Sequence, residues 1–136
     1  MRVRKVLPIF AVLLLVFGFN QALNAQRERG GRWIHLGEKH VDGNYDHDKI
    51  SIGGSEGRFR QLQIRVFDAP VDFLRVVVHL GNGADEDLQF RERVRAGGET
   101  RPLDLRGNDR EIKSVEFWYE KANWGRRRPR VELFGR

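Results

Sequence analysis

Hydrophobic and polar residues alternate along most of the chain beyond Trp33. In residues 62–66, leucine, isoleucine and valine alternate with glutamine and arginine, and in residues 74–80 every second residue is leucine or valine. A period of two is typical of a β-strand that buries one of its faces. The same period returns at 88–94, 115–119 and 131–133. No stretch of ten residues in this region shows a helical period, so the pattern predicts strands throughout.

Turn signals rich in glycine, asparagine and aspartate separate these segments at intervals of about 8 to 15 residues. They predict about eight strands, at 33–41, 48–52, 58–68, 71–81, 86–95, 99–106, 111–121 and 129–135. Short strands at this spacing favour an all-β fold, a single antiparallel β-sandwich with a jelly-roll-like arrangement. A change of phase between Phe73 and Leu74 predicts a β-bulge there.

The amino-terminal segment has a different pattern. Three positive charges in residues 1–5 precede an apolar run at 6–19, which is shorter than the roughly 20 residues of a membrane-spanning helix. The pattern predicts a helical signal peptide over 1–25, cleaved after Ala25 or alternatively after Ala22, and an uncleaved anchor is the alternative. A flexible leader over 26–32 and the sandwich domain over 33–136 follow. We therefore expect a periplasmic or secreted protein without a membrane span after signal removal.

Composition narrows the possible chemistry. Removal of 25 of the 136 residues leaves 111, which is enough for one domain with its own core. The chain has no cysteine, so disulfides, thiolate metal sites and cysteine nucleophiles are excluded. The net charge of +6 falls to +3 once the three basic residues of the signal are removed. So small a surplus on an exported chain does not favour a nucleic-acid partner.

An acidic segment has the spacing of a calcium-binding loop. Oxygen-bearing side chains occupy alternate positions at Asp42, Asn44, Asp46 and Asp48. The pattern then departs from an EF-hand, because His47 replaces the glycine at position six and Gly53 the glutamate at position twelve. Aspartates next to glycine also form ordinary turns. We prefer the turn, and a calcium-stabilised domain stays the alternative; no other cofactor is expected.

No residue pattern points to catalysis. None of the four histidines belongs to a zinc-binding pair on one face of a helix. They are His35, His40, His47 and His79. The serines lack the Gly-x-Ser-x-Gly motif of a nucleophile elbow, and no pair of carboxylates is singled out for glycoside cleavage. The sequence therefore predicts a protein that is not an enzyme.

Aromatic and basic residues gather near the carboxyl terminus. The candidate ligand-binding residues are Trp118, Trp124, Arg126, Arg127, Arg128 and Arg130. If Phe117 and Tyr119 face the core, Trp118 faces outward, because side chains alternate across a strand. Exposed aromatic rings stack on sugars, and arginines bind carboxylates, phosphates or sulfates in bidentate fashion. In the plainer interpretation, which we prefer, the indole packs beneath a loop and the arginines keep a hairpin tip soluble.

Several short motifs together resemble a known family. They are Leu36-Gly37, Val41-Asp42, Gly81-Asn82-Gly83, Ala96-Gly97-Gly98, Asp104-Leu105-Arg106-Gly107 and Val115-x-Phe117-Trp118-Tyr119. The chain resembles, from about Trp33 to Arg136, an uncharacterised family of small exported bacterial proteins with a domain of unknown function. The resemblance implies a β-sandwich in the cell envelope or outside the cell. It implies no activity, ligand or catalytic residue.

The functional expectation is accordingly general. We expect a non-catalytic exported module that recognises an envelope polymer or a protein through the aromatic and arginine residues. The alternatives are a structural envelope protein that acts through protein contacts and a calcium-stabilised domain. The sequence does not predict the oligomeric state.

Overall fold

The computed structural model describes residues 31–41, 47–53 and 57–136. A compact unit spans Trp33–Arg136. The predicted signal peptide and residues 26–30 of the predicted leader lie outside the described residues, so both stay predictions. Within the described ranges, no helix has the length and apolar character that crossing a membrane requires.

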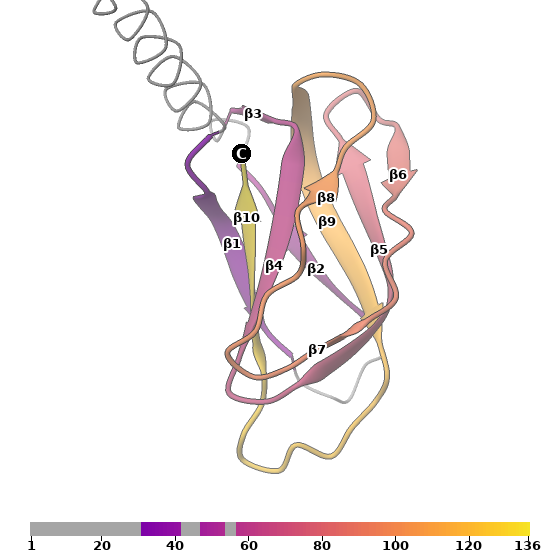
Figure 1. The fold of residues 1–136 in the computed structure, drawn as a ribbon. Helices are drawn as coiled ribbons and strands as arrows, with labels where there is room; N and C mark the ends of the chain where they lie inside the picture. The colour runs from indigo at the N-terminus through magenta and orange to yellow at the C-terminus, as the bar shows by residue number, and fades with distance from the viewer. Residues whose placement is uncertain (1–30, 42–46, 54–56) are drawn as a thin grey trace, which may run out of the picture. The chain divides into compact units, whose positions relative to one another are not determined.

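Two antiparallel sheets pack face to face, as Figure 1 shows. The first sheet has the order β1 (Ile34–His40), β10 (Arg130–Gly135), β4 (Gln61–Phe67) and β8 (Leu103–Asp104). The second has the order β2 (His47–Ser51), β9 (Arg110–Tyr119), β5 (Val71–Leu80) and β6 (Asp85–Asp87). Two short strands complete the second sheet, with β3 (Arg58–Phe59) on β9 and β7 (Arg93–Val94) on β5. The predicted all-β sandwich is confirmed.

The strand order is that of a jelly roll. When β3 and β7 are left out, the first, eighth, third and sixth strands form one sheet, and the second, seventh, fourth and fifth form the other. Consecutive strands therefore cross from sheet to sheet, except at the β5–β6 hairpin. Crossings of this kind bring together, at each end of the sandwich, strand ends and loops that are distant in sequence.

The structure has ten strands where the sequence predicts eight. The predicted strand 58–68 is divided at Arg60, because β3 pairs with β9 in one sheet and β4 with β10 in the other. The predicted strand 86–95 is interrupted where the Asp87 carboxylate accepts the Gln89 N–H and Gln89 has a φ of 53°. The predicted strand 99–106 shrinks to β8, preceded by Pro102, which has no N–H to donate.

The core lies between the two sheets. The largest fully buried side chains come from both sheets and include Phe73 and Phe117 of the second sheet and Ile64 and Leu133 of the first. The pairing of β5 with β9 shifts register between Phe73 and Arg75, which confirms the predicted bulge. Phe117 and Tyr119 face the core, so Trp118 between them faces outward, as predicted.

Candidate functional site

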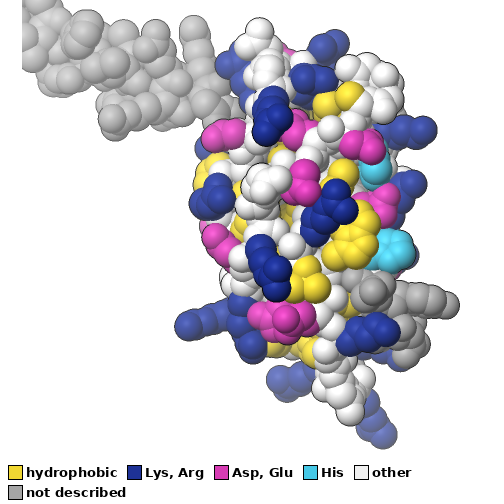
Figure 2. Space-filling view, turned by 90° about the vertical axis from the view of Figure 1, so that its right-hand side faces the viewer, with side chains coloured by type: hydrophobic (Ala, Val, Ile, Leu, Met, Phe, Trp, Pro, Cys, Tyr) yellow, Lys and Arg dark blue, Asp and Glu magenta, His cyan; other side chains and the backbone are white. Residues whose placement is uncertain are grey.

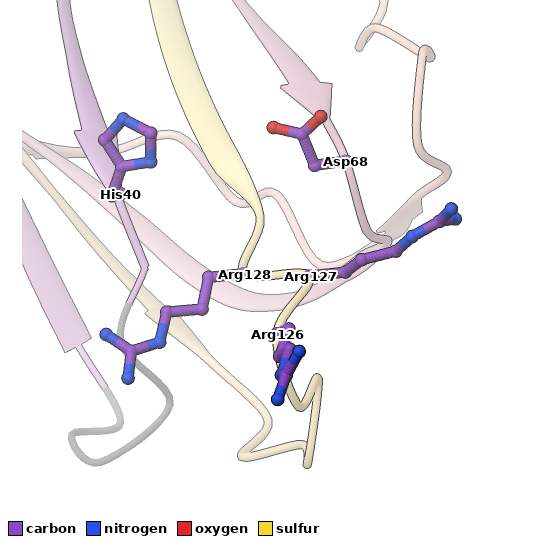
Figure 3. A pocket seen from close by; sticks show the side chains of 5 residues that line it. All are labelled: His40, Asp68, Arg126, Arg127 and Arg128. Carbon is purple, nitrogen blue, oxygen red and sulfur yellow. The ribbon is translucent and has the colours of Figure 1, made fainter.

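An open hollow of about 670 Å³ lies at one end of the sandwich, where the β9–β10 loop passes β1 and the β4–β5 turn. The loop contributes Arg126, Arg127 and Arg128, the end of β1 contributes His40, and the turn contributes Asp68 (Figure 3). Asp68 has a φ of 75°, a conformation that aspartate tolerates in turns. The jelly-roll crossings thus bring together five polar residues from three separate segments.

Trp124 anchors the arginine loop to the body of the domain. Its indole Nε1–H donates a hydrogen bond to the Pro70 carbonyl at 3.1 Å. Its ring lies 6.0 Å from the ring of Tyr119 and packs against the core. The Asn123 side chain accepts the N–H of Gly125, which has a φ of 59°. Trp124 therefore has a structural role beneath the loop.

The loop is also tied at its far end. The N–H of Val41 donates to the Pro129 carbonyl at 2.9 Å, which joins the end of β1 to the residue after the three arginines. The N–H of Arg127 donates to the Trp124 carbonyl at 3.1 Å and closes a turn. A loop tied at both ends loses less conformational entropy when a ligand orders it.

The three arginine side chains extend in different directions. In Figure 3, Arg128 lies on the side of His40, Arg127 points away from it, and Arg126 points away from the strands. All three residues are exposed, and Asp68 is the one carboxylate among the described residues that line the hollow. Diverging guanidinium groups suit several anionic groups spaced along a ligand better than one compact anion.

Trp118 lies elsewhere, on the outer face of the second sheet. It pairs with His47 of β2 on one side and with Arg75 of β5 on the other. The His47 ring stacks on the indole at 5.7 Å with an interplanar angle of 17°, and the Arg75 guanidinium lies 5.1 Å from the ring centre. Because both flanking strands place side chains against the indole, a sugar would have to displace one of them to stack there.

A charged network adjoins Trp118 on the same face. The imidazole of His79 contacts the Asp85 carboxylate at 2.6 Å through Nδ1 and the Glu116 carboxylate at 2.7 Å through Nε2. The hydrogen bond to Asp85 raises the pKa of His79 most, burial lowers it, and Glu116 raises it further. Figure 2 shows this side of the molecule, with histidine side chains next to acidic ones around a hydrophobic patch.

A second charged contact joins β6 to β5. The Arg75 guanidinium donates to the Asp87 carboxylate at 2.9 Å, and the Gln89 N–H donates to its other oxygen at 2.9 Å. These two bonds, the backbone bond from Gln89 first, lower the pKa of Asp87. Both nitrogens of His79 and both oxygens of Asp87 are thus engaged within the protein.

Arg130 lies on the opposite side of the sandwich, on the outer face of the first sheet. Its guanidinium stacks on Phe67 at 4.6 Å and lies 4.0 Å from Glu38 and 3.7 Å from Glu132. The candidate residues therefore do not form a single site. Arg126, Arg127 and Arg128 share the hollow, Trp124 supports them, and Trp118 and Arg130 face away from each other on different sheets.

The candidate calcium loop is described only in part. Asp42, Asn44 and Asp46 lie outside the described residues, so the calcium interpretation stays a prediction. Asp48 is described, and its carboxylate accepts the hydroxyl hydrogen bond of the buried Tyr119 at 2.8 Å. This contact gives Asp48 a structural role that needs no ion.

Two residues of the hollow, His40 and Asp68, are not among the sequence-predicted site residues. Asp68 belongs to an Asp-Ala-Pro turn, and His40 ends an edge strand. Nothing in their local sequence distinguishes them from ordinary turn and edge residues. Only the strand order shows that they meet the arginine loop, and one sequence does not give that order.

Comparison with known proteins supports the fold. A family model described as a domain of unknown function (DUF2541) matches residues 9–135. Pseudomonas aeruginosa AlgX is a similar solved structure, with a TM-score of 0.55 and 16% sequence identity. The match covers 77% of this chain and 26% of the AlgX chain, so this chain spans about a quarter of AlgX. At this identity the likeness concerns the fold alone. No curated protein matches the sequence significantly.

Proposed function

The chain belongs to DUF2541, a family of domains of unknown function, and from this premise we propose that it is a non-catalytic module that binds an anionic polymer. One observation carries the proposal. Three consecutive exposed arginines on a tethered loop line an open hollow together with His40 and Asp68.

The arrangement suits an extended anionic ligand. Guanidinium groups bind carboxylate, phosphate and sulfate groups with paired hydrogen bonds. Arg126 and Arg127 make no ion pair or hydrogen bond through their side chains with any other described residue, so binding would not first have to break one. Because the hollow is open and the side chains diverge, a chain carrying repeated anionic groups can contact all of them.

The lining favours binding over catalysis. Among the described residues of the hollow there is one histidine, one aspartate and three arginines, without a serine or a pair of carboxylates. Acyl transfer needs a nucleophile within hydrogen-bonding reach of a base, and glycoside cleavage needs two carboxylates. Neither set occurs among the described residues that line the hollow.

We place this module in the periplasm or outside the cell. The support is the amino-terminal sequence, in which basic residues precede an apolar run of signal-peptide length. The partner in this proposal is therefore an anionic polymer of the cell envelope, such as an acidic polysaccharide or a phosphate-bearing polymer.

Binding to a panel of defined polymers tests the proposal. We expect dextran sulfate or polygalacturonate to bind and uncharged dextran not to bind. Arg126→Ala with Arg127→Ala should weaken binding roughly thirtyfold, at about 1 kcal/mol for each of the two lost charged contacts. Higher salt should weaken binding of the unaltered chain, because exposed charges are screened.

A charge-matched control separates the site from bulk charge. Arg101→Ala with Arg106→Ala also removes two exposed positive charges, on either side of β8 and away from the arginine loop. We expect this pair to leave binding within about twofold, as for a screened remote charge. Equal losses in the two pairs would show that only net charge matters. No binding to any charged polymer, with self-association in sedimentation, would favour the structural alternative.

A further inference from the structure

Three potential metal ligands meet on the outer face of the first sheet. His35, Glu38 and Glu132 each offer one ligand atom, and these atoms all lie within 4.8 Å of one another. His35 and Glu38 come from β1, and Glu132 comes from the neighbouring strand β10. None of these three residues lines the hollow at the arginine loop, so the group forms a separate site.

An irregularity in β1 creates this group. In a regular strand, residues three apart point to opposite faces. The pairing of β1 with β10 shifts register between His35 and Gly37, so that both His35 and Glu38 stand on the outer side. Bulges of this kind re-aim side chains and occur often near functional sites. The bulge thus adds a nitrogen ligand to two carboxylates.

The two carboxylates share one counter-ion, Arg130. Glu38 and Glu132 are directly opposite each other in the β1–β10 pairing, where like charges are destabilising. Nη1 of Arg130 lies 4.0 Å from one oxygen of Glu38 and 3.7 Å from one oxygen of Glu132, beyond hydrogen-bonding distance. Stacking on Phe67 at 4.6 Å holds this guanidinium in place. Neither carboxylate accepts a hydrogen bond from another described residue, so each has an oxygen with which to bind a cation.

His35 is oriented for the same position. Its ring meets Phe134 edge to face at 5.3 Å with an interplanar angle of 78°. Phe134 is itself fixed by the Arg65 guanidinium, which lies 3.9 Å above its ring. Neither nitrogen of His35 makes a hydrogen bond with another described residue, so a ring nitrogen is available to a metal.

We propose that His35, Glu38 and Glu132 bind a zinc ion on the outer face of the first sheet. One imidazole nitrogen and two carboxylate oxygens form a mixed donor set that zinc accepts and that calcium or magnesium, which prefer oxygen alone, does not favour. The fourth position of a tetrahedral ion faces solvent and takes water or a side chain of a partner. Arg130 then serves as an outer partner of the two ligating carboxylates.

Thermal unfolding of the purified chain, prepared without a histidine tag, tests this site. Saturating zinc should raise the Tm of the unaltered chain by at least about 5 °C, by mass action on the folded state. His35→Ala should abolish this shift. His40→Ala, at an exposed histidine of the same strand outside the group, should retain it. No shift in the unaltered chain, or an equal shift in both variants, would overturn the proposal.

Glu38→Gln provides a sharper test, because it separates metal binding from a folding defect. The substitution removes the repulsion between opposed carboxylates, so the Tm without zinc should stay equal or rise. The zinc-induced shift should nevertheless disappear. A zinc shift that persists in Glu38→Gln contradicts the assignment of this ligand.

Cobalt offers a measurement that needs no variant. Co²⁺ in the site should give visible absorption bands that equimolar Zn²⁺ removes and excess Ca²⁺ does not. Absence of the bands, or their removal by Ca²⁺, would count against a mixed nitrogen and oxygen site. This result does not bear on the polymer proposal, since the two sites share no residue.

Discussion

At the scale of single residues, both ring nitrogens of His79 are engaged by carboxylates. Asp85 from β6 and Glu116 from β9 each accept a hydrogen bond from one of its ring nitrogens, which requires the doubly protonated imidazolium. Ser114, its neighbour on β9, is buried and uncharged. His79 therefore links a three-residue edge strand to the centre of its sheet.

This arrangement predicts a pH-dependent stability. The pKa of His79 is raised above its ordinary value of 6.5 in the folded protein. The imidazolium therefore contributes its full stabilisation below about pH 6.5, and that contribution is lost as the pH rises through the folded pKa. Chemical denaturation at a series of pH values should show the free energy of unfolding falling over that window.

His79→Gln supplies the comparison for this prediction. Glutamine can still donate a hydrogen bond but does not titrate. The variant should be less stable at pH 6, and its free energy of unfolding should vary less between pH 6 and higher pH than that of the unaltered chain. An identical pH dependence in the two proteins would remove His79 as its source.

Trp124 makes a second prediction at this scale. Trp124→Leu keeps an apolar side chain but loses the hydrogen bond to Pro70 and the ring contact with Tyr119. We expect a loss of about 1–3 kcal/mol in the free energy of unfolding. Polymer binding should weaken as well, although Trp124 does not line the hollow, because the arginine loop loses its anchor. Unchanged binding would show that the loop does not need this tether.

At the scale of elements, the close approach of β10 to β1 and β3 depends on a glycine. A Cβ atom at Gly135 would lie 2.8 Å from the Phe59 ring and 2.9 Å from Cδ1 of Leu36, both in the core. Gly135→Ala should therefore destabilise the fold by about 1–3 kcal/mol through overpacking. Equilibrium denaturation measures this directly, and a neutral result would mean that the two sheets separate easily at this end.

The strands show which part of the fold a sequence predicts. The long segments with period two, such as β4, β5 and β9, are found where the pattern places them. The pattern gives no warning that the chain changes sheets at Arg60, because both flanking pieces keep their alternation. The pattern also predicts too many strand residues between β6 and β8, because the irregular residues around Gln89 and Pro102 still alternate in polarity.

At the scale of the whole molecule, the candidate site depends on topology more than on composition. The sequence identifies the three arginines of the β9–β10 loop but groups them with Trp118 and Arg130, which the structure places on opposite outer faces. Proximity in sequence misleads here, because side chains alternate across a strand and the loop carries the chain to the other sheet. The contribution of His40 and Asp68 follows only from the jelly-roll order.

The two proposals assign two different surfaces of the domain to two different ligands. In these proposals, the arginine loop binds anionic groups at one end of the sandwich, and the three potential zinc ligands lie on the outer face of the first sheet. If both hold, zinc should leave the polymer affinity nearly unchanged, since no residue is shared. Polymer titrations with and without zinc measure this coupling. A large change in affinity would show that the two sites communicate or that zinc also binds the polymer.

The most direct test of the central claim is a map of where the polymer contacts the domain. Amide chemical shifts of the isotopically labelled chain, followed by NMR during titration with a short dextran sulfate fragment, provide that map. The account predicts the largest changes at the loop around Arg126–Arg128 and at His40 and Asp68. Changes centred on Trp118 and His79, or spread evenly over every exposed arginine, would contradict it.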